Sequence, residues 1–571
     1  MASSQSNQQH LQAIVDMGSN GIRFSISSLQ PPTARIMPTL YQHRAGISLY
    51  DAQYSASGER QPIDDQTTDA VVLAYRQFKR TCVDFGVPEE HITVLATEAT
   101  RTAINSEAFR QQIKDAVGWE VTLMPKELEG EVGALGIASS LPEVKGLVMD
   151  LGGGSTQLSW LASSGVDANV RMPENGAVSL PYGAAAMSRR LAEAEKSGIV
   201  EALKQEVKTA LKDAYERLNT SEDLKKYALR CGGYTLYLSG GGFRGWGYVL
   251  MSKHRVRPYP IPVINGFKAS RQQFMDTEEV KDAAAATLRN EDDEIFRVSD
   301  RRASQVPAVA FLINALAEAL PDVAEVRFCQ GGVREGYLFR MLSPDVQAYH
   351  PLVVATLPFS PTPSGPVMQL LKSAFPAGST ASAQDDYKNT FTTELVESFA
   401  NLMYHHSSYS KDLQTSAALR STTSGSLAGV HGILHESRAL LALLLCARWG
   451  GDVPPTDQIF KSQLEKLVES PWTLWWIQYL GAIAALIAAV YPAGVAEGAQ
   501  YARLALHASW DADEKGRPVL LTKVSLEDDA DTMVFEKEIK AVEKAGKKKN
   551  WIGGRDGIGH KVDVEVEMIS R

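Results

Sequence analysis

The chain has 571 residues, which is enough for about two to four globular domains. Hydrophobic residues make up 44% and charged residues 22%, as in soluble globular proteins, and the net charge of −9 argues against binding to duplex nucleic acid, which usually requires a basic face. Cys82, Cys231, Cys329 and Cys446 are far apart and form no CxxC pair, which argues against a zinc site and fits a reducing compartment. Residues 1–10 are polar and lack the apolar region of a secretory signal, so we expect a loose, disordered tail on a cytoplasmic protein.

Residues 13–26 contain an apolar run that ends in an aspartate, a turn of small residues and an alternating apolar run. This pattern predicts a strand, a tight turn and a second strand. The turn contains Gly18, Ser19 and Asn20, whose backbone and side chains suit contact with a phosphate. Asp16 precedes the turn and would repel a phosphate, but it can bind a hydrated Mg²⁺ that the phosphate also contacts.

Helical and strand patterns alternate over residues 65–124. Glu127, Glu129 and Glu131 then open a helix of small residues. The three acids suit a solvated helix N-terminus, where the helix dipole favours negative charge. Alternatively, one carboxylate beside a phosphate cleft would orient or deprotonate an attacking water. The residues of this segment leave both interpretations open.

The strand–turn–strand pattern occurs a second time, at residues 147–160, and again the first strand ends in an aspartate, Asp150. The turn consists of Gly152, Gly153, Gly154 and Ser155, and Thr156 follows. Adjacent glycines allow positive φ angles and close approach of a ligand, and consecutive N–H groups in such a turn can form an anion-binding concavity. Asp150 is a second candidate ligand of Mg²⁺. Two such hairpins predict a duplicated domain that closes on a phosphate from both sides, which resembles the actin, sugar-kinase and heat-shock-chaperone ATPases.

Beyond the second hairpin, residues 191–218 show one strong helical pattern, and residues 300–320 show another. Between them a strand ends in a second glycine cluster, which contains Gly241 and Gly242. Such a cluster suits close approach to a nucleotide's ribose or base, or to a further phosphate. We therefore include both glycines among the candidate ligand-binding residues.

Residues 471–500 contain a single charged side chain, Glu497, and residues 472–491 are largely apolar. A membrane span needs about 20 apolar residues, so this segment is long enough. However, alanine and glycine make up much of it, Gln478 lies inside it and Pro492 ends it. We therefore expect a buried helix and no membrane span.

Six short motifs occur in the order found in the Ppx/GppA family, the exopolyphosphatases and guanosine pentaphosphate phosphohydrolases, which this chain resembles over residues 11–345. The motifs span residues 16–20, 96–101, 128–130, 150–156, 300–303 and 331–336. The resemblance implies an α/β fold in which two duplicated actin-like ATPase (ribonuclease H-like) halves, residues 11–130 and 131–345, surround a phosphate cleft. Residues 346–571 resemble more weakly the mostly helical HD-like C-terminal domain of longer family members, and we expect this domain to end in strands.

The resemblance also implies roles for single residues. Glu129 matches the catalytic base that activates water, and Arg101 matches the arginine that grips the polyphosphate chain. Asp150 matches the aspartate near the metal, and the two glycine turns match the family's phosphate-binding turns. Gln157 departs from the pattern, since the hydrolases carry a glutamate there in an acidic, metal-linked constellation. A neutral amide cannot act as a base and is a poorer Mg²⁺ ligand, so ligand binding would survive this change while turnover falls.

The C-terminal region also departs from the family pattern. An HD hydrolase needs neighbouring His and Asp residues as metal ligands, but residues 445–450 read Leu-Cys-Ala-Arg-Trp-Gly where that pair is expected. The pair His405-His406 and the pair His431 and His435 lie elsewhere. The second pair has the spacing of metal ligands on one helix, although surface or capping roles also explain it. We expect an interaction domain that lacks the HD metal ligands.

Two functional hypotheses stay open. In the regulatory one, the cleft binds a nucleotide or inorganic polyphosphate with Mg²⁺, and signalling protein partners respond to its closure. Gln157, the turn at residues 239–244 and the C-terminal extension resemble a fungal branch of the family that relays mitochondrial state to nuclear gene expression. In the enzymatic one, the protein releases terminal phosphate, with Glu129 as the base and Mg²⁺ near Asp150. We expect no direct contact with nucleic acid, and a homodimer stays open.

Overall fold

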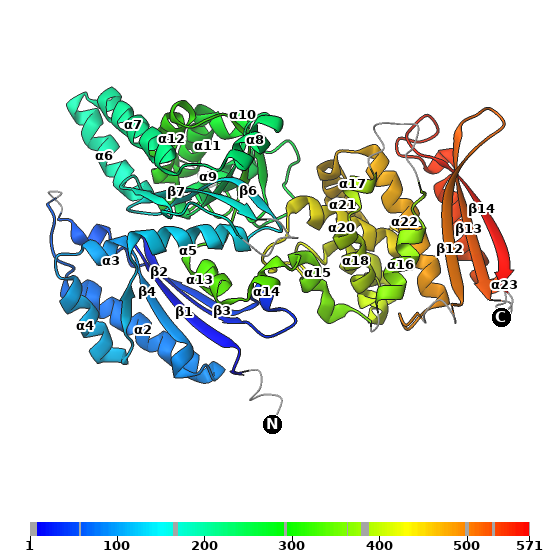
Figure 1. Cartoon of the computed structure of the whole chain (residues 1–571), viewed down its shortest axis with the longest axis horizontal. Coiled ribbons are helices and arrows are strands. Elements are labelled where there is room, and N and C mark those ends of the chain that lie inside the picture. Colours follow the sequence, from blue (N-terminus) through cyan, green and yellow to red (C-terminus); the bar gives the residue numbers. More distant parts are fainter. Residues whose placement is uncertain are drawn as a thin grey trace. The chain divides into compact units, whose positions relative to one another are not determined.

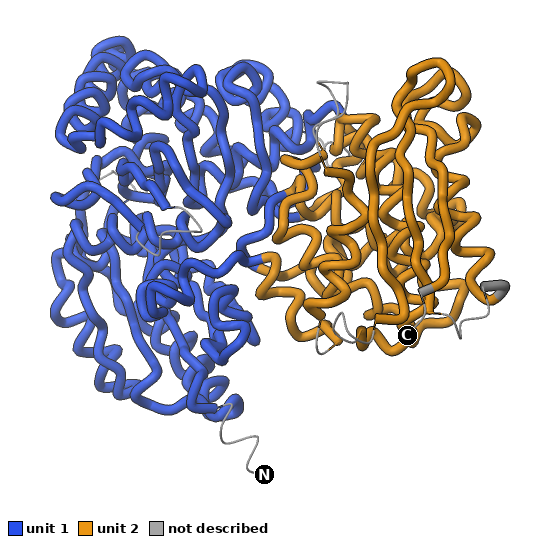
Figure 2. Tube along the Cα trace, turned by 45° about the vertical axis from the view of Figure 1, so that its right-hand side comes forward, with its two compact units in different colours: residues 1–255, 263–351, 431–434 blue, residues 256–262, 352–430, 435–571 orange. Residues whose placement is uncertain are grey.

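The computed structural model describes residues 8–55, 59–163, 170–289, 294–361, 364–377, 387–496, 502–527 and 532–569. The chain forms two compact units, which Figure 2 shows in different colours. Unit 1 comprises residues 1–255, 263–351 and 431–434, and unit 2 comprises residues 256–262, 352–430 and 435–571.

The first half of unit 1 is built on a five-stranded sheet with the order β3-β2-β1-β4-β5. Its strands are β1 (Leu11–Gly18), β2 (Gly21–Ser28), β3 (Thr39–Ala45), β4 (Ile92–Ala96) and β5 (Val121–Leu123). The first three strands form an antiparallel meander, while β4 pairs in parallel with β1 and with β5. The helices of this half are α2 (Asp65–Phe85), α3 (Glu98–Thr102) and α4 (Ser106–Val117), and the apolar faces of α2 and α4 share one core with the sheet.

The second half repeats this arrangement within a six-stranded sheet, β10-β11-β9-β6-β7-β8. Its strands are β6 (Val144–Leu151), β7 (Thr156–Ser163), β8 (Val178–Leu180), β9 (Tyr234–Ser239), β10 (Lys268–Ser270) and β11 (Val323–Phe328). The series β8-β7-β6-β9-β11 has the same order and directions as β3-β2-β1-β4-β5. The helices are α6 (Ala184–Ser197), α7 (Val200–Arg217), α8 (Glu222–Arg230), α9 (Gly241–Ser252), α10 (Arg271–Met275), α11 (Thr277–Arg289) and α12 (Asp300–Ala319). The duplicated actin-like halves predicted for this α/β region are therefore present.

Two helices, α5 (Lys126–Ser139) and α13 (Val333–Met341), lie between the two sheets and share a core with residues of both (Figure 1). Glycines let the backbones of the two helices nearly touch. A Cβ added to Gly336 would lie 1.8 Å from the carbonyl oxygen of Val132, and one added to Gly136 would lie 2.3 Å from that of Gly332. This close packing holds the N-terminus of α5, where Glu129 lies, at the ends of β1 and β6.

Unit 2 is mostly helical and ends in a three-stranded sheet, as the sequence predicted. Its helices include α16 (Gly365–Ser373), α17 (Tyr387–Thr390), α18 (Thr393–Leu402), α19 (Lys411–Arg420), α20 (His435–Arg448), α21 (Pro455–Val468), α22 (Pro471–Val490) and α23 (Thr532–Ala545). Two short helices precede them in the chain: α14 (Pro344–Ala348), which belongs to unit 1, and α15 (Pro351–Thr356), which belongs to unit 2 from Leu352 onward. The sheet has the order β12-β13-β14, with strands β12 (Leu504–Ala512), β13 (Pro518–Glu527) and β14 (Lys561–Ile569).

Helix α22 is the apolar segment that is long enough to cross a membrane, and among the described residues it is the one helix that passes this test. Within its most apolar window, 72% of the residues are buried inside the structure. Trp475, Trp476 and Tyr479 are among the largest fully buried side chains. This burial agrees with the prediction of a core helix. Glu497, the charge that follows the segment, lies outside the described residues.

Several sequence-based expectations need correction. The single helix predicted for residues 191–218 is two helices, because Gly198 takes a φ of +69° and ends α6. The predicted boundary between the halves at residue 130 falls inside α5. Of the predicted tail, residues 1–7 lie outside the described part, but the carbonyl of His10 accepts a hydrogen bond from the N–H of Leu29 at 2.9 Å, so the chain is ordered there.

The proposed i, i+4 histidine pair does not share a helix. His435 is the first residue of α20, and its Nδ1 lies 2.7 Å from the hydroxyl of Tyr259. His431 belongs to unit 1, where its Nε2 lies 2.8 Å from Oγ of Ser139. The two side chains therefore contact different partners and do not form one metal site.

Candidate functional site

The turns of the two Asp-bearing hairpins face each other. Ser19 and Asn20 connect β1 to β2, and residues 152–155 connect β6 to β7. A Cβ added to Gly153 would lie 2.6 Å from the side-chain amide of Asn20, and one added to Gly154 would lie 3.4 Å from Oγ of Ser19. The two turns thus meet across one gap, as the duplicated pattern predicted.

In the two turns, the backbone carbonyl oxygens and the backbone N–H groups differ in whether they have hydrogen-bond partners. The carbonyl oxygens of Gly152, Gly153 and Gly154 accept hydrogen bonds from the N–H groups at the start of α6 and just before it, at 2.9–3.1 Å. The carbonyl of Ser19 accepts from the N–H of Tyr50 at 2.9 Å. Within the described part of the chain, the N–H groups of Ser19, Asn20, Gly153 and Gly154 donate to no acceptor. The carbonyl oxygens of the turns are therefore already hydrogen-bonded within the protein, whereas these N–H groups are available as donors. Available N–H donors are the groups that bind an anion.

The reason for the glycines differs from the one expected from sequence. None of Gly152, Gly153 and Gly154 has a positive φ. Close approach requires them instead, because a side chain at 153 would collide with Asn20 and one at 154 would lie 3.1 Å from Oε2 of Glu98. Gly21, which follows the first turn, has a φ of +155°, a conformation that residues with a side chain rarely adopt, and a Cβ added there would lie 2.9 Å from Nε of Arg44.

Asp16 and Asp150 lie at equivalent positions of β1 and β6, next to the two turns. Burial raises the pKa of both carboxyl groups, and the charge of Asp16 raises that of Asp150 further. Arginines oppose this effect: Arg23 lies 3.7 Å from Asp16, and Arg244 lowers the pKa of Asp150. The two carboxylates are therefore close enough to repel each other.

These two carboxylates fit a Mg²⁺ ion. This ion is usually held by one or two carboxylates together with water and substrate phosphates, and it would relieve the repulsion between Asp16 and Asp150. Oε2 of Glu98 is also buried without a hydrogen-bond partner, beside Gly154. Among the described residues no group of three or more His, Cys, Asp or Glu side chains forms a metal site by itself, so phosphate and water would have to supply the remaining ligands.

Glu129 lies in this cleft and is 8% exposed. Burial raises its pKa, Arg101 opposes this effect, and the neighbouring carboxylates of Glu98 and Asp16 add to it, so that the pKa is about 7. Nη1 of Arg101 lies 3.1 Å from Oε2 of Glu129 and also donates to the carbonyl of Met124. A carboxyl group with a pKa near 7 is suited to act as a base at neutral pH. The geometry therefore favours the functional interpretation of this acid over the solvated helix N-terminus.

Thr156 and Gln157 support the second turn. Thr156 is fully buried, and its hydroxyl donates to the carbonyl of Tyr182 at 2.8 Å, so it holds the turn in place. The amide nitrogen of Gln157 donates to Oγ of Ser155 at 2.8 Å. Gln157 pairs across the ladder with Asp150, so a glutamate there would add a carboxylate on the face that carries Asp150.

The second glycine cluster begins a helix, which sequence reasoning interpreted only as a turn. Gly241 is the first residue of α9, and a Cβ added to it would meet nothing within 4 Å. A Cβ added to Gly240 would lie 2.3 Å from Oδ1 of Asp150, whereas one added to Gly242 would collide with the side chain of Leu151. A helix N-terminus therefore faces the cleft beside Asp150, where its dipole favours an anion.

A cluster of arginines, which sequence reasoning missed, surrounds the two turns. It comprises Arg23, Arg44, Arg244, Arg301 and Arg302. Burial, together with the charges of Arg23 and Arg302, lowers the pKa of Arg244 to about 9. Burial and neighbouring arginines likewise lower the pKa of Arg44 and Arg302. The Arg301-Arg302 doublet at the start of α12 was the available sequence signal, but its position beside the turns is a tertiary fact.

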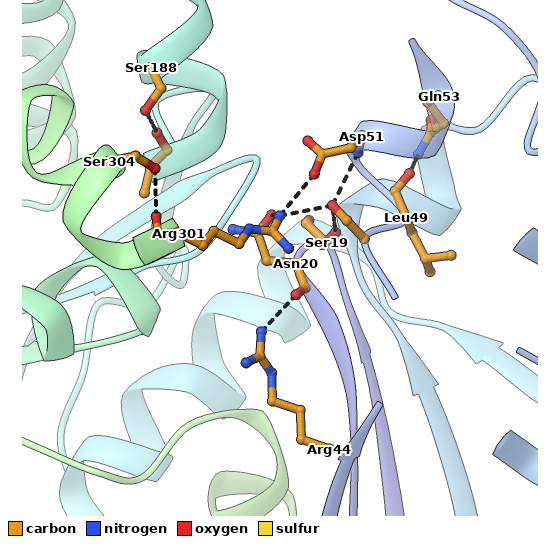
Figure 3. Close-up of polar contacts among 11 residues, drawn as sticks. Ser19, Asn20, Arg44, Leu49, Asp51, Gln53, Ser188, Arg301 and Ser304 are labelled. Carbon is orange, nitrogen blue, oxygen red and sulfur yellow. Dashed lines mark hydrogen bonds and ion pairs between the residues drawn. The ribbon is translucent and has the colours of Figure 1, made fainter. Parts of the chain in front are cut away.

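Arg301 connects the two halves directly (Figure 3). Its Nη2 donates to Oδ1 of Asn20 at 3.0 Å, to Oγ of Ser48 at 3.0 Å and to Oδ2 of Asp51 at 2.9 Å. On the other side of the turn, Nη2 of Arg44 donates to the carbonyl of Asn20 at 2.9 Å. The carbonyl of Asn20 is therefore hydrogen-bonded as well.

The chain is similar to known proteins over most of its length. Residues 28–344 match the model of the Ppx/GppA phosphatase family, and residues 350–569 match that of the RTG2 C-terminal domain. The chain is 38% identical over 498 residues to retrograde regulation protein 2 of Saccharomyces cerevisiae, a match that covers 85% of this chain and 82% of the yeast protein. A shorter match to the guanosine-5'-triphosphate,3'-diphosphate pyrophosphatase of Photobacterium profundum is 36% identical over 84 residues and covers 14% of this chain and 16% of that protein.

Among solved structures, the Ppx/GppA enzyme of Aquifex aeolicus is similar to this chain with 22% sequence identity and a TM-score of 0.43. The match covers 58% of this chain and 99% of the Aquifex chain.

Proposed function

Because this chain belongs to the Ppx/GppA phosphatase family, we propose that the cleft of unit 1 binds a phosphate chain, either inorganic polyphosphate or the phosphates of a nucleotide, together with Mg²⁺. The observation that carries this proposal is the set of available N–H donors at the two facing turns. In the described part of the chain, the N–H groups of Ser19, Asn20, Gly153 and Gly154 have no acceptor, while the neighbouring carbonyl oxygens are hydrogen-bonded. Arginine and backbone N–H groups form strong charge-assisted hydrogen bonds with phosphate oxygens. The five arginines around the turns suit a ligand with several phosphates.

We propose further that binding serves signalling through protein partners. The chain is a homologue of retrograde regulation protein 2 and carries the RTG2 C-terminal domain. The name of the yeast relative refers to retrograde regulation. We propose that this chain acts in the same kind of signalling, as a relay of mitochondrial state to transcription. Its four cysteine thiols are all free, which fits the cytoplasm as the place of action.

Hydrolysis of the phosphate chain is the second candidate function, and the position of Glu129 favours it. In this reaction the ionised carboxylate of Glu129 accepts a proton from water, the water oxygen bonds to the terminal phosphorus, and the phosphoanhydride bond breaks as the shortened chain leaves. Arg101 orients the carboxylate, and the arginines hold the chain. Asp16 and Asp150 would hold a Mg²⁺ ion, whose charge would offset that of the phosphate oxygens.

A calorimetric titration tests binding. We expect ATP, GTP, guanosine tetraphosphate or long polyphosphate to bind with Mg²⁺, and Arg244→Gln to weaken binding by about tenfold or more, since charge-assisted hydrogen bonds contribute about 1.5–3 kcal/mol. Arg230→Gln is the matched control, because Arg230 is exposed on α8. If none of these ligands binds, or if both variants weaken binding equally, the assignment of the cleft is wrong.

Gln157→Glu separates the two candidate functions. The new carboxylate would accept a hydrogen bond from Ser155 and add a Mg²⁺ ligand beside Asp150. If the natural protein is a binding protein, we expect phosphate release from polyphosphate only in the variant. If it is a hydrolase, the natural protein releases phosphate and Glu129→Ala does not.

A further inference from the structure

Residues 48–54, which follow β3, form a segment that is anchored to the first half of unit 1. Leu49 is fully buried in the core of that half. Nε2 of Gln53 donates to the carbonyl of Leu49 at 2.8 Å and to that of Ala99 at 2.9 Å, and the N–H of Tyr50 donates to Ser19. These anchors hold the segment at both ends and present the side chain of Asp51 between them.

Two arginines of the second half contact residues 48–54. Nη2 of Arg301 lies 2.9 Å from Oδ2 of Asp51 (Figure 3). The guanidinium of Arg189, on α6, lies 3.8 Å from the ring centroid of Tyr54. Because Arg301 and Arg189 come from α12 and α6, both contacts join the two halves beside the phosphate turns. We call the Arg301–Asp51 pair the latch.

The latch is built to be displaced. Nη2 of Arg301 carries two hydrogens but has three acceptors within 3.0 Å, in Asn20, Ser48 and Asp51, so one acceptor always lacks a full hydrogen bond. The side chains of Arg301 and Asp51 are 38% and 58% exposed, and such exposed ion pairs contribute little. A phosphate group offers several charged oxygens and forms stronger, bidentate bonds with arginine.

We propose that the Asp51 carboxylate occupies Arg301 in the ligand-free protein as a stand-in for a phosphate of the ligand, and that an incoming phosphate chain displaces it. Asp51 is an acid beside a cluster of arginines, so it also repels a polyanion until it is displaced. When Asp51 is displaced, residues 48–54 lose their ion pair to the second half. The surface that they form then changes, and a protein partner can recognise this change. This inference rests on the proposed binding of a phosphate chain in the cleft.

The test uses sodium tripolyphosphate as the probe and the full-length Asp51→Asn variant, which keeps the shape of the side chain and removes its charge. Calorimetry should show about three- to fivefold tighter binding than in the natural protein, the range expected when an exposed charge pair is removed. Asp69→Asn is the matched control, because Asp69 is exposed on α2 and changes the net charge equally. Unchanged or weaker binding by Asp51→Asn would overturn the proposal.

Epistasis provides a second criterion. Arg301→Gln should weaken binding, and Asp51→Asn should bring little improvement in the Arg301→Gln background, since Asp51 acts through Arg301. An equal improvement in both backgrounds would show that Asp51 acts only by general repulsion, which also overturns the latch.

Hydrogen exchange without ligand separates the failure of the latch from the failure of the proposed function. Residues 48–54 should exchange faster in Asp51→Asn than in the natural protein or Asp69→Asn, because one contact to the second half is lost. Unchanged exchange would exclude the latch even if tripolyphosphate binds. Faster exchange without any tripolyphosphate binding would leave a contact between the halves but would overturn both the proposed function and the displacement by phosphate.

Discussion

Glu129 shows how one side chain acquires its chemistry from its surroundings. The sequence places it among three acids at a helix start, and the structure places it in the cleft at 3.1 Å from Arg101. Arg101 would keep the carboxyl group ionised, but burial and the neighbouring acids outweigh it, and the pKa rises to about 7. The same residue therefore changes both the stability of the protein and its capacity to accept a proton near neutral pH.

Glu129→Gln should reveal this shift as a pH-dependent gain in stability. Below pH 4.5 the carboxyl group is protonated in the folded and unfolded chain alike, so the variant should differ little from the natural protein in this respect. Between pH 4.5 and about 7 only the unfolded chain ionises, and the natural protein loses stability. Above pH 7 the difference should approach about 3 kcal/mol, the equivalent of a pKa raised from 4.5 to about 7, and this pKa already includes the opposing effect of Arg101.

Thermal unfolding of both proteins from pH 4.5 to 8.5 measures this effect. Glu127→Gln, on the same helix but exposed, is the control and should follow the natural protein. A Glu129→Gln advantage that does not grow with pH would contradict the assigned pKa. If the protein hydrolyses phosphate chains, its rate should rise through pH 7 and be absent in Glu129→Gln.

At the scale of elements, the packing of α5 against α13 decides where the site lies. Gly136 and Gly336 allow backbone contact between the helices, so α5 can fit between the two sheets and carry Glu129 to the turns of both hairpins. The turns show the same dependence, since Gly153 is needed because Asn20 approaches from the other half. In both places glycine is required because a residue that is distant in the sequence packs against it, and not because the chain bends there.

Gly336→Ala should destabilise unit 1. The added Cβ would lie 1.8 Å from the carbonyl oxygen of Val132, and backbone cannot move away as a flexible side chain can. Alanine improves helix propensity by about 1 kcal/mol, but overpacking of this kind costs about 1–3 kcal/mol or more, so the net sign is a loss.

Denaturant unfolding measures the change. The control is Gly46→Ala, since a Cβ at Gly46 meets nothing within 4 Å. If Gly336→Ala and Gly46→Ala unfold at the same denaturant concentration, the helices can separate at no cost and the packing does not position Glu129.

At the scale of the whole molecule, the two units are not two consecutive stretches of chain. Residues 256–262 belong to unit 2 although unit 1 residues flank them, and residues 431–434 belong to unit 1 although unit 2 residues flank them. Within unit 1, residues 431–434 place His431 beside Ser139, at the end of α5. Burial raises the pKa of Glu335 on α13, but Arg334 and, after it, His431 lower this pKa below its usual value. A cut at residue 351 would therefore not yield a complete unit 1.

A fragment of residues 8–351 should accordingly be less stable than unit 1 in the full chain. It lacks the bond from His431 to Ser139, and it leaves residues 256–262 without unit 2, where the hydroxyl of Tyr259 lies 2.7 Å from His435. About 2–4 °C in melting temperature is expected for each kcal/mol lost. Calorimetric melting of the fragment, the full chain and full-length His431→Ala makes the comparison. A fragment that melts with the first transition of the full chain would show that these segments are dispensable.

Much of the fold and of the site was visible in the sequence. The two Asp-bearing hairpins and the core helix at residues 471–490 carry local signals, namely strand alternation, glycine turns and apolar runs, which depend on neighbours a few residues away. The two hairpins themselves predicted the duplication, and the family motifs added the role of Glu129 as the candidate base, because the order of the motifs along the chain is itself sequence information.

The tertiary structure alone decided the rest. The arginine cluster draws on β2, β3, α9 and α12, and Arg301 meets Asp51 across 250 residues of chain. Which carbonyls are occupied and which N–H groups stay free at the turns, which half grips residues 48–54 and which unit holds residues 431–434 all depend on the packing of segments far apart in sequence. Local periodicity reports which face of an element is buried, but it does not report what the element is buried against.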